Sequence, residues 1–213
     1  MKLVIGYKNY SSWSLRAWLC LQHFGLSFEE VIIPLFQPGY REQLAQYSKA
    51  LKVPVLVDGP VTVWDSLAIC EYVNDTYLEG RAWPADPQVR AVARSASAEM
   101  HSGFFAIRND FPMNCRESIS MEPSAEVLGE IARIDALWGE LRERFGGSGP
   151  YLFGSFSIAD CMYAPIASRF RTYGVTLSGI SRHYQEALLA NPAMQQWLAA
   201  ASKEDSHLEL FEK

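Results

Sequence analysis

Charged residues are scarce in this chain of 213 residues: they make up 20% of it, and 19 Lys and Arg against 24 Asp and Glu give a net charge of −5. Bulk nucleic-acid binding needs a surplus of cations to neutralise phosphates, so we exclude it. No run approaches the roughly 18 uncharged apolar residues of a membrane span, so we expect no membrane partner. At 49% hydrophobic residues, the chain is too apolar to be disordered, and its length fits one large domain or two small ones.

Cysteine is also rare, with Cys20, Cys70, Cys115 and Cys161 at wide, irregular spacings and without a C-x-x-C pair. Metal sites need closely spaced ligands, so we expect no metal. Three of the four thiols lie in apolar helical patterns, where a free cysteine acts as a small hydrophobic side chain. The first seven residues, MKLVIGY, predict a strand and not a signal peptide. A reducing, cytoplasmic location is therefore expected.

The first 78 residues alternate between strand and helix patterns. Their order, β-α-β-α-β-β-α, predicts a small α/β domain. Apolar runs with strand propensity cover residues 2–7, 28–33, 55–57 and 61–64, and helical spacing covers residues 15–24, 40–47 and 66–77.

Strand patterns disappear after residue 87. Residues 79–87 contain a glycine and two prolines and predict a linker. Beyond it, residues 88–213 predict an all-helical domain, because apolar residues recur three and four positions apart. The predicted helices cover residues 88–110, 124–145, 157–172, 184–190 and 194–201.

Three polar features of the first domain point to chemistry. Ser11 and Ser12 lie between the first strand and the first helix, where a helix N-terminus offers an anion site, although the serines can also be simple N-caps. Pro54 opens a buried strand; a cis bond there would present the backbone N–H and C=O of Val53 to a ligand. Ser66, after Asp65, either caps the next helix or binds a carboxylate.

Four motifs together resemble the cytosolic glutathione transferase superfamily across essentially the whole chain. They are residues 10–16 (YSSWSLR), 53–59 (VPVLVDG), 65–72 (DSLAICEY) and 157–160 (SIAD). The resemblance implies a thioredoxin-like N-terminal domain, an all-helical C-terminal domain, glutathione as co-substrate and a homodimer. The last motif is similar to a capping box that starts the core helix.

The resemblance also implies roles for individual residues. The first motif is similar to the serine motif of the zeta-like and theta-like classes, which makes Ser11 the first choice for the catalytic residue and Ser12 the alternative. Trp13 stands where the zeta motif has a cysteine. The implied glutathione-binding residues are Trp13, Lys52, Val53, Pro54, Asp65 and Ser66, with Ser66 on the γ-glutamyl carboxylate, Asp65 on its amino group and Lys52 on the glycyl carboxylate.

A serine in this position would act on the thiol of glutathione. A thiol of pKa ~8.5 is only about 3% thiolate at pH 7, and the thiolate is the nucleophile. Serine is too weak a base to take the proton, but its hydroxyl can donate a hydrogen bond to the sulfur anion. Such a bond lowers the thiol pKa by about 1–2 units, and the helix N-terminus acts in the same direction.

The resemblance further implies that the second substrate binds between the domains, facing the helix at residues 88–110. Phe104 and Phe105 are candidates for an apolar pocket, together with Phe111, while His101 or Arg108 would orient an anionic group. The competing interpretation places the aromatic rings in the core and Arg108 in a structural ion pair. Two further arginines at positions 169 and 171 also belong to the candidate set.

These residues predict a glutathione transferase that conjugates glutathione to small electrophiles. One alternative is a zeta-like isomerase, which adds glutathione to a cis-enoic diacid and releases it after rotation; it needs cations for two carboxylates. Another alternative is a glutathione transferase-like binding or scaffold domain without catalysis.

Overall fold

The computed structural model describes residues 1–147 and 149–212, and its sheet has four strands in the order β2-β1-β3-β4. Strand β1 (Lys2–Ile5) pairs in parallel with β2 (Glu29–Ile32) and antiparallel with β3 (Val55–Asp58). Strand β4 (Val61–Trp64) completes a hairpin with β3. The crossover between β1 and β2 leaves room for one helix, which begins directly at the serine motif.

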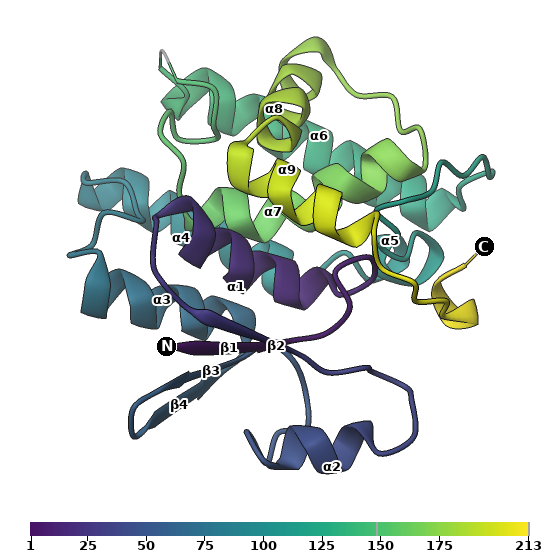
Figure 1. Ribbon diagram of the computed structural model, residues 1–213. Helices are drawn as coiled ribbons and strands as arrows, with labels where there is room; N and C mark the ends of the chain where they lie inside the picture. Colours follow the sequence, from purple (N-terminus) through teal and green to yellow (C-terminus); the bar gives the residue numbers. More distant parts are fainter. Residues whose placement is uncertain (148, 213) are drawn as a thin grey trace.

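Helices cover both faces of this sheet (Figure 1). Helices α1 (Ser12–His23) and α3 (Ser66–Tyr77) lie on one face and the short α2 (Tyr40–Ala45) on the other. Alternate residues of β1 separate the two cores: Leu3 and Ile5 join the cluster that holds α1 and α3, whereas Val4 packs with Leu44 of α2.

The remainder of the chain is helical and stacks on α1 and α3 (Figure 1). The predicted fold class, an α/β domain followed by a helical domain, is confirmed. Among the described residues, none of the helices combines the length and apolar character needed to cross a membrane. The elements are α4 (Pro87–Ser102), α5 (Phe105–Asp110), α6 (Ala125–Phe145), α7 (Ile158–Thr172), α8 (Gly179–Leu189), α9 (Pro192–Ala201) and the 3-10 turn η1 (Glu209–Phe211).

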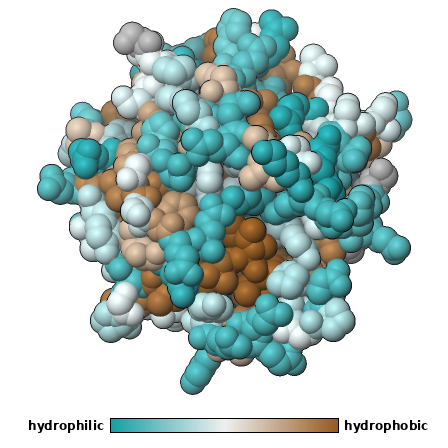
Figure 2. Space-filling view, in the orientation of Figure 1, coloured by the Kyte–Doolittle hydropathy of each residue, from teal (hydrophilic) through white to brown (hydrophobic). Residues whose placement is uncertain are grey.

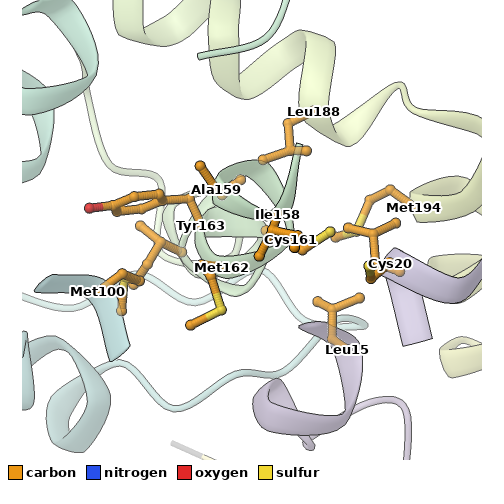
Figure 3. Close-up of a cluster of buried hydrophobic side chains, with 14 of the residues drawn as sticks. Leu15, Cys20, Met100, Ile158, Ala159, Cys161, Met162, Tyr163, Leu188 and Met194 are labelled. Atoms are coloured by element: carbon orange, nitrogen blue, oxygen red, sulfur yellow. The ribbon is translucent and has the colours of Figure 1, made fainter. Parts of the chain in front are cut away.

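Helix α7 forms the centre of the hydrophobic core (Figure 3). It packs against α1, α4 and α8, so that Cys161 and Leu15 of α1 belong to the same buried cluster. Met100 of α4 and Leu188 of α8 approach α7 from its other sides. The larger core therefore runs from the sheet through α1 into the helical domain without interruption.

A buried capping box fixes the start of α7, as the sequence predicted. The Asp160 Oδ2 atom accepts hydrogen bonds from the Ser157 N–H at 2.8 Å and the Ser157 hydroxyl at 3.0 Å, while Oδ1 accepts from the Leu152 N–H at 3.1 Å. Burial raises the pKa of Asp160 to about 6, and these bonds act against that rise.

The predicted single helix over residues 88–110 is wrong, because the chain breaks into α4 and α5. Gly103 ends α4 at a point where a Cβ would lie 2.9 Å from the Glu99 carbonyl oxygen. Phe104 follows with φ +60° in the left-handed region. Two other helices begin earlier than predicted, at Gly179 and Pro192. The domain boundary at residues 79–87 stays a prediction.

Replacing Asp160 by alanine removes the acceptor for two buried backbone N–H groups. We expect Asp160→Ala to lower the free energy of unfolding by about 3 kcal/mol in urea denaturation, because unsatisfied buried donors are costly. Glu186, exposed on α8, provides the control: Glu186→Ala changes this free energy by less than about 0.5 kcal/mol. Equal effects in the two variants would contradict the role of the capping box.

Candidate active site

A cleft of about 800 Å³ opens between the sheet domain and the helices. Figure 2 shows apolar side chains gathered at the level of the sheet, below the C-terminal helices. The cleft is lined from both halves of the chain. Of the residues singled out from the sequence, it brings together Ser11, Ser12, Trp13, Lys52, Val53, Pro54, Asp65, Ser66, Arg108 and Arg169.

The two serines at the start of α1 have different hydrogen-bond partners. The Ser11 hydroxyl donates to the Ser14 Oγ atom at 2.7 Å and does not cap α1, although Ser11 is the N-cap residue. The Ser12 Oγ atom accepts a hydrogen bond from the Arg169 Nη2 atom at 3.3 Å. The Ser12 hydroxyl proton is therefore available to an acceptor in the cleft.

Asp65 and Ser66 form a carboxylate-sized polar site at the start of α3. Asp65, with φ +77°, caps the helix through Oδ1, which accepts from the Leu67 N–H at 2.9 Å. The Ser66 hydroxyl is fully buried and lines the cleft, and it has no hydrogen-bond partner among the described residues. Since buried hydroxyls are normally paired, Ser66 and the helix N-terminus together fit an anionic ligand group.

Val53 and Pro54 lie on the same wall of the cleft, before β3, and the peptide bond between them is cis. Lys52 is exposed beside them and has no ion pair within the described part of the chain. The ammonium group of Lys52 is therefore uncommitted and lies at the edge of the cleft.

Three arginines concentrate positive charge around Trp13. The guanidinium carbons of Arg16 and Arg108 lie 4.4 and 5.1 Å from the centre of the indole ring. Burial is the main cause that lowers the pKa of Arg16 to about 9 and that of Arg169 to about 10. All three side chains stay protonated at neutral pH, so they favour anions in the cleft.

Arg108 and Arg169 are held by backbone carbonyls. The Arg108 Nε atom donates to the Gly103 carbonyl at 2.9 Å, and its Nη2 atom donates to the Met100 carbonyl. The Arg169 Nε atom donates to the Phe111 carbonyl at 2.8 Å. Neither guanidinium forms an ion pair among the described residues, although the Glu130 carboxylate, which accepts from the N–H groups of Ala106 and Ile107, partly offsets the charge of Arg108.

His101, Phe104 and Phe105 lie outside the cleft, which corrects the expected apolar pocket. The break after α4 turns Phe104 into the core, at 7% exposure, and leaves Phe105 64% exposed on α5. His101 lies behind Asp65, with its Nε2 atom 3.2 Å from Oδ2, and its ring meets Trp13 edge-on. Burial lowers the pKa of His101, so it is neutral at pH 7.

The other two candidates for the second-substrate site are also placed elsewhere. Phe111 is buried and stacks on Tyr173, with ring centres 4.2 Å apart. Arg171 donates to the Cys115 carbonyl at 2.7 Å and is not part of the cleft lining. Both side chains support the packing of α7.

Sequence reasoning missed the aromatic wall of the cleft. Phe211, from the 3-10 turn near residue 210, stacks on Tyr10 with ring centres 5.5 Å apart and lies 5.9 Å from the ring of Phe36. Leu208 lines the same wall. The signal in the sequence is three apolar residues in a polar tail, at positions 208, 210 and 211, which is too weak to indicate a site.

The tail that carries Phe211 is bonded to the loop before the serines. The Glu204 carboxylate accepts from the Lys8 N–H at 2.7 Å and the Asn9 N–H at 2.9 Å. Arg116 donates to the Glu204 carbonyl at 2.5 Å and to the hydroxyl of Tyr10 at 2.8 Å. These contacts fix both the loop and the aromatic wall.

Among the described residues, no group of three His, Cys, Asp or Glu side chains is arranged to hold a metal ion. The polar groups that line the cleft favour organic anions: a Ser66 hydroxyl without a partner among the described residues, a helix N-terminus and the guanidiniums of Arg108 and Arg169.

Comparison with known proteins agrees with this arrangement. Models of the glutathione S-transferase N-terminal and C-terminal domains match residues 10–76 and 122–200. A maleylacetoacetate isomerase of Rattus norvegicus is 30% identical over 89% of this chain and 88% of its own length.

Two solved structures share the fold. A glutathione transferase homologue from Burkholderia gl BGR1, with bound glutathione, superposes with a TM-score of 0.73 at 23% identity and covers 95% of this chain and 98% of its own. A bacterial maleyl pyruvate isomerase of the zeta class superposes with a TM-score of 0.74 at 21% identity and covers 97% of this chain and 100% of its own.

Removing the Glu204 carboxylate leaves the Lys8 and Asn9 N–H groups without their acceptor. We expect Glu204→Ala to lower the free energy of unfolding by about 2 kcal/mol in urea denaturation. The neighbouring Asp205 is exposed, and Asp205→Ala is the matched control, with a change within about 0.5 kcal/mol. A Glu204→Ala protein as stable as this control would show that the carboxylate does not hold the loop.

Proposed function

The chain belongs to the glutathione S-transferase family, and from this premise we propose that it is a glutathione-dependent isomerase of a cis-enoic diacid. The observation that carries the proposal is the presence of Arg108 and Arg169 on the cleft beside the serine pair. A diacid brings two carboxylates, and the half-buried Arg108 and the buried Arg169, neither of which forms an ion pair within the described residues, are the groups that would bind them. The similarity to maleylacetoacetate isomerases supports this choice over general conjugation.

The residues of the first domain fit glutathione. Ser66, with its unpartnered hydroxyl at the start of α3, receives the γ-glutamyl carboxylate, and Asp65 receives the amino group. Val53 offers its backbone to the cysteinyl residue, and Lys52 is placed for the glycyl carboxylate. Each assignment pairs a charge of the tripeptide with an opposite charge or a free donor of the protein.

Bound glutathione would supply a thiolate that adds to the double bond, allows rotation about the resulting single bond and then leaves. Ser12 is the stronger candidate for the hydroxyl that stabilises this thiolate, because Arg169 donates to its oxygen and leaves its proton free. The Ser11 hydroxyl donates to Ser14 instead and must turn to reach the sulfur. Ser11 remains the alternative.

Arg169 would also stabilise the negative charge that develops on the diacid when the thiolate adds. Addition to an enoic acid moves negative charge onto a carbonyl or carboxylate oxygen, and a fixed guanidinium stabilises that charge without reorganising. Its Nε atom is held by the Phe111 carbonyl, so the guanidinium is already in position before the diacid binds. Arg108, whose guanidinium carbon lies 5.1 Å from the centre of the Trp13 ring, would bind the other carboxylate.

Conjugation of glutathione to small electrophiles is the second candidate function. The aromatic wall of Phe36, Trp64 and Phe211 favours it, since an apolar electrophile gains free energy by stacking there. If the protein catalyses neither isomerisation nor conjugation, it is a glutathione transferase-like binding domain.

We also propose a homodimer and a reducing, cytoplasmic setting. Val61, Trp64 and Tyr77 expose apolar surface along β4 and α3, which a second copy of the chain would cover. All four cysteines are free and buried, which fits a reducing location.

Isomerisation of a cis diketo diacid in the presence of glutathione tests the proposed function. We expect turnover in the wild type and a loss of about 100-fold in kcat/KM in Arg169→Met, because a charge that stabilises the transition state is removed. Arg171→Met, on the same helix but outside the cleft, keeps nearly the full rate. Conjugation of aryl halides without any isomerisation would replace this function by the second candidate.

The choice between the two serines is made by single substitutions. We expect Ser12→Ala to lower the rate of isomerisation 10- to 100-fold while glutathione affinity, measured by calorimetry, changes little; a lost hydrogen bond to an anion is worth about 1.5–3 kcal/mol. Ser11→Ala is the matched control one residue away. A larger loss in Ser11→Ala than in Ser12→Ala would transfer the role to Ser11.

A further inference from the structure

Arg16 is a charged side chain whose burial the fold does not explain. It lies in the second turn of α1 and has no exposed surface, and none of its three guanidinium nitrogens has a hydrogen-bond partner among the described residues. Structural arginines normally use their donors, as Arg169 does with the carbonyls of Phe111 and Pro165. A buried guanidinium without such bonds is costly, so a role in packing alone does not account for it.

Arg16 contacts a residue of the cleft lining. Its guanidinium carbon lies 4.4 Å from the ring centre of Trp13, which lines the cleft. Ser12 precedes Arg16 by four residues, so the two side chains lie on the same side of α1 about 5–6 Å apart at Cβ. The charge of Arg16 is therefore next to both residues that face the reacting end of the cleft.

The groups that face Arg16 do not neutralise it. Arg108 from α5 and Arg169 from α7 oppose its charge, and Asp65 and the Cys70 thiol from α3 favour it. Asp65 is already shared with His101 and with the first backbone N–H groups of α3. Arg16 thus faces two guanidiniums and one carboxylate, Asp65, while Glu130 partly offsets the charge of Arg108. An anion in the cleft would relieve the remaining imbalance of positive charge.

We propose that Arg16 is an electrostatic positioning residue whose buried charge stabilises the thiolate of glutathione bound beside Ser12. The inference rests on the thiolate step of the proposed function and adds a group that touches neither glutathione nor the diacid. The indole of Trp13 and the first turn of α1 lie between the Arg16 charge and the thiolate, so little water screens the electrostatic interaction between them. At a separation of about 7 Å and an effective dielectric constant of about 20, one charge shifts a pKa by about 1–2 units.

The test is a pH titration of the thiolate absorbance of glutathione bound to the full-length protein, which needs no second substrate. We expect Arg16→Gln, which removes the charge and keeps the polarity, to raise the pKa of the bound thiol by about 1 unit or more. Arg16→Lys, which keeps the charge, is expected to stay within a few tenths of a unit of the wild type. Arg171→Met serves as the control for loss of a positive charge outside the cleft and leaves the thiol pKa unchanged.

The comparison of Gln with Lys separates charge from packing. Equal thiol pKa values in Arg16→Gln and the wild type, with glutathione still bound, would overturn the inference and leave the proposed function standing. Equal shifts in Arg16→Lys and Arg16→Gln would also overturn it, because they would show a packing effect. If the thiol of glutathione bound to the wild type titrates like that of free glutathione, the thiolate step of the proposed function is contradicted. If the pKa shifts are as expected but no isomerisation occurs, only the diacid is contradicted as the substrate.

Discussion

The packing of α7 against α1 is the constraint on which the rest of the site depends. Helix α1 starts at the serine loop and is buried through Leu21, so its position is set by the sheet on one side and by α7 on the other. Because α7 is held at its start by the Asp160 capping box, Arg169 arrives beside Ser12 from the opposite half of the chain. The serine motif belongs to the first domain, but its hydrogen-bond environment belongs to the second, and neither half would form this arrangement alone.

The same packing gives a chain with a net charge of −5 a positive cleft. Net charge describes the whole surface, whereas the field inside the cleft depends on the few charges that low-dielectric walls surround. Arg16, Arg108 and Arg169 lie in such surroundings, where Asp65 acts on Arg16 and Glu130 on Arg108, so two carboxylates face three guanidiniums. Glutathione is anionic, so its attraction to this protein is a local property that composition alone conceals.

Much of the fold follows from the sequence, because it depends on local patterns. The β-rich run at β1, the apolar spacing in α6 and the capping box at Ser157 each have a residue-level signature, and each was predicted, although β1 ends two residues earlier than expected. The break at Gly103 was missed because glycine is tolerated within a helix pattern, and only the close approach to the Glu99 carbonyl requires the turn. The glutathione half of the site could be predicted from contiguous motifs. The second half could be predicted only in part: Arg108 and Arg169 were candidates, whereas Phe36 and Phe211 reach the cleft only through tertiary packing.

The aromatic wall of the cleft can change in evolution independently of the residues that are proposed to hold glutathione. Phe211 and Leu208 belong to a tail outside the main core, whereas the serine loop and α3 are embedded in it. Substitutions in such a segment change shape at low cost in stability, because few buried contacts depend on them. Related chains can therefore acquire new second substrates by altering a few tail residues, while the groups that hold glutathione stay the same. A change of second substrate would then need no change in the helices that carry Arg16, Arg108 and Arg169.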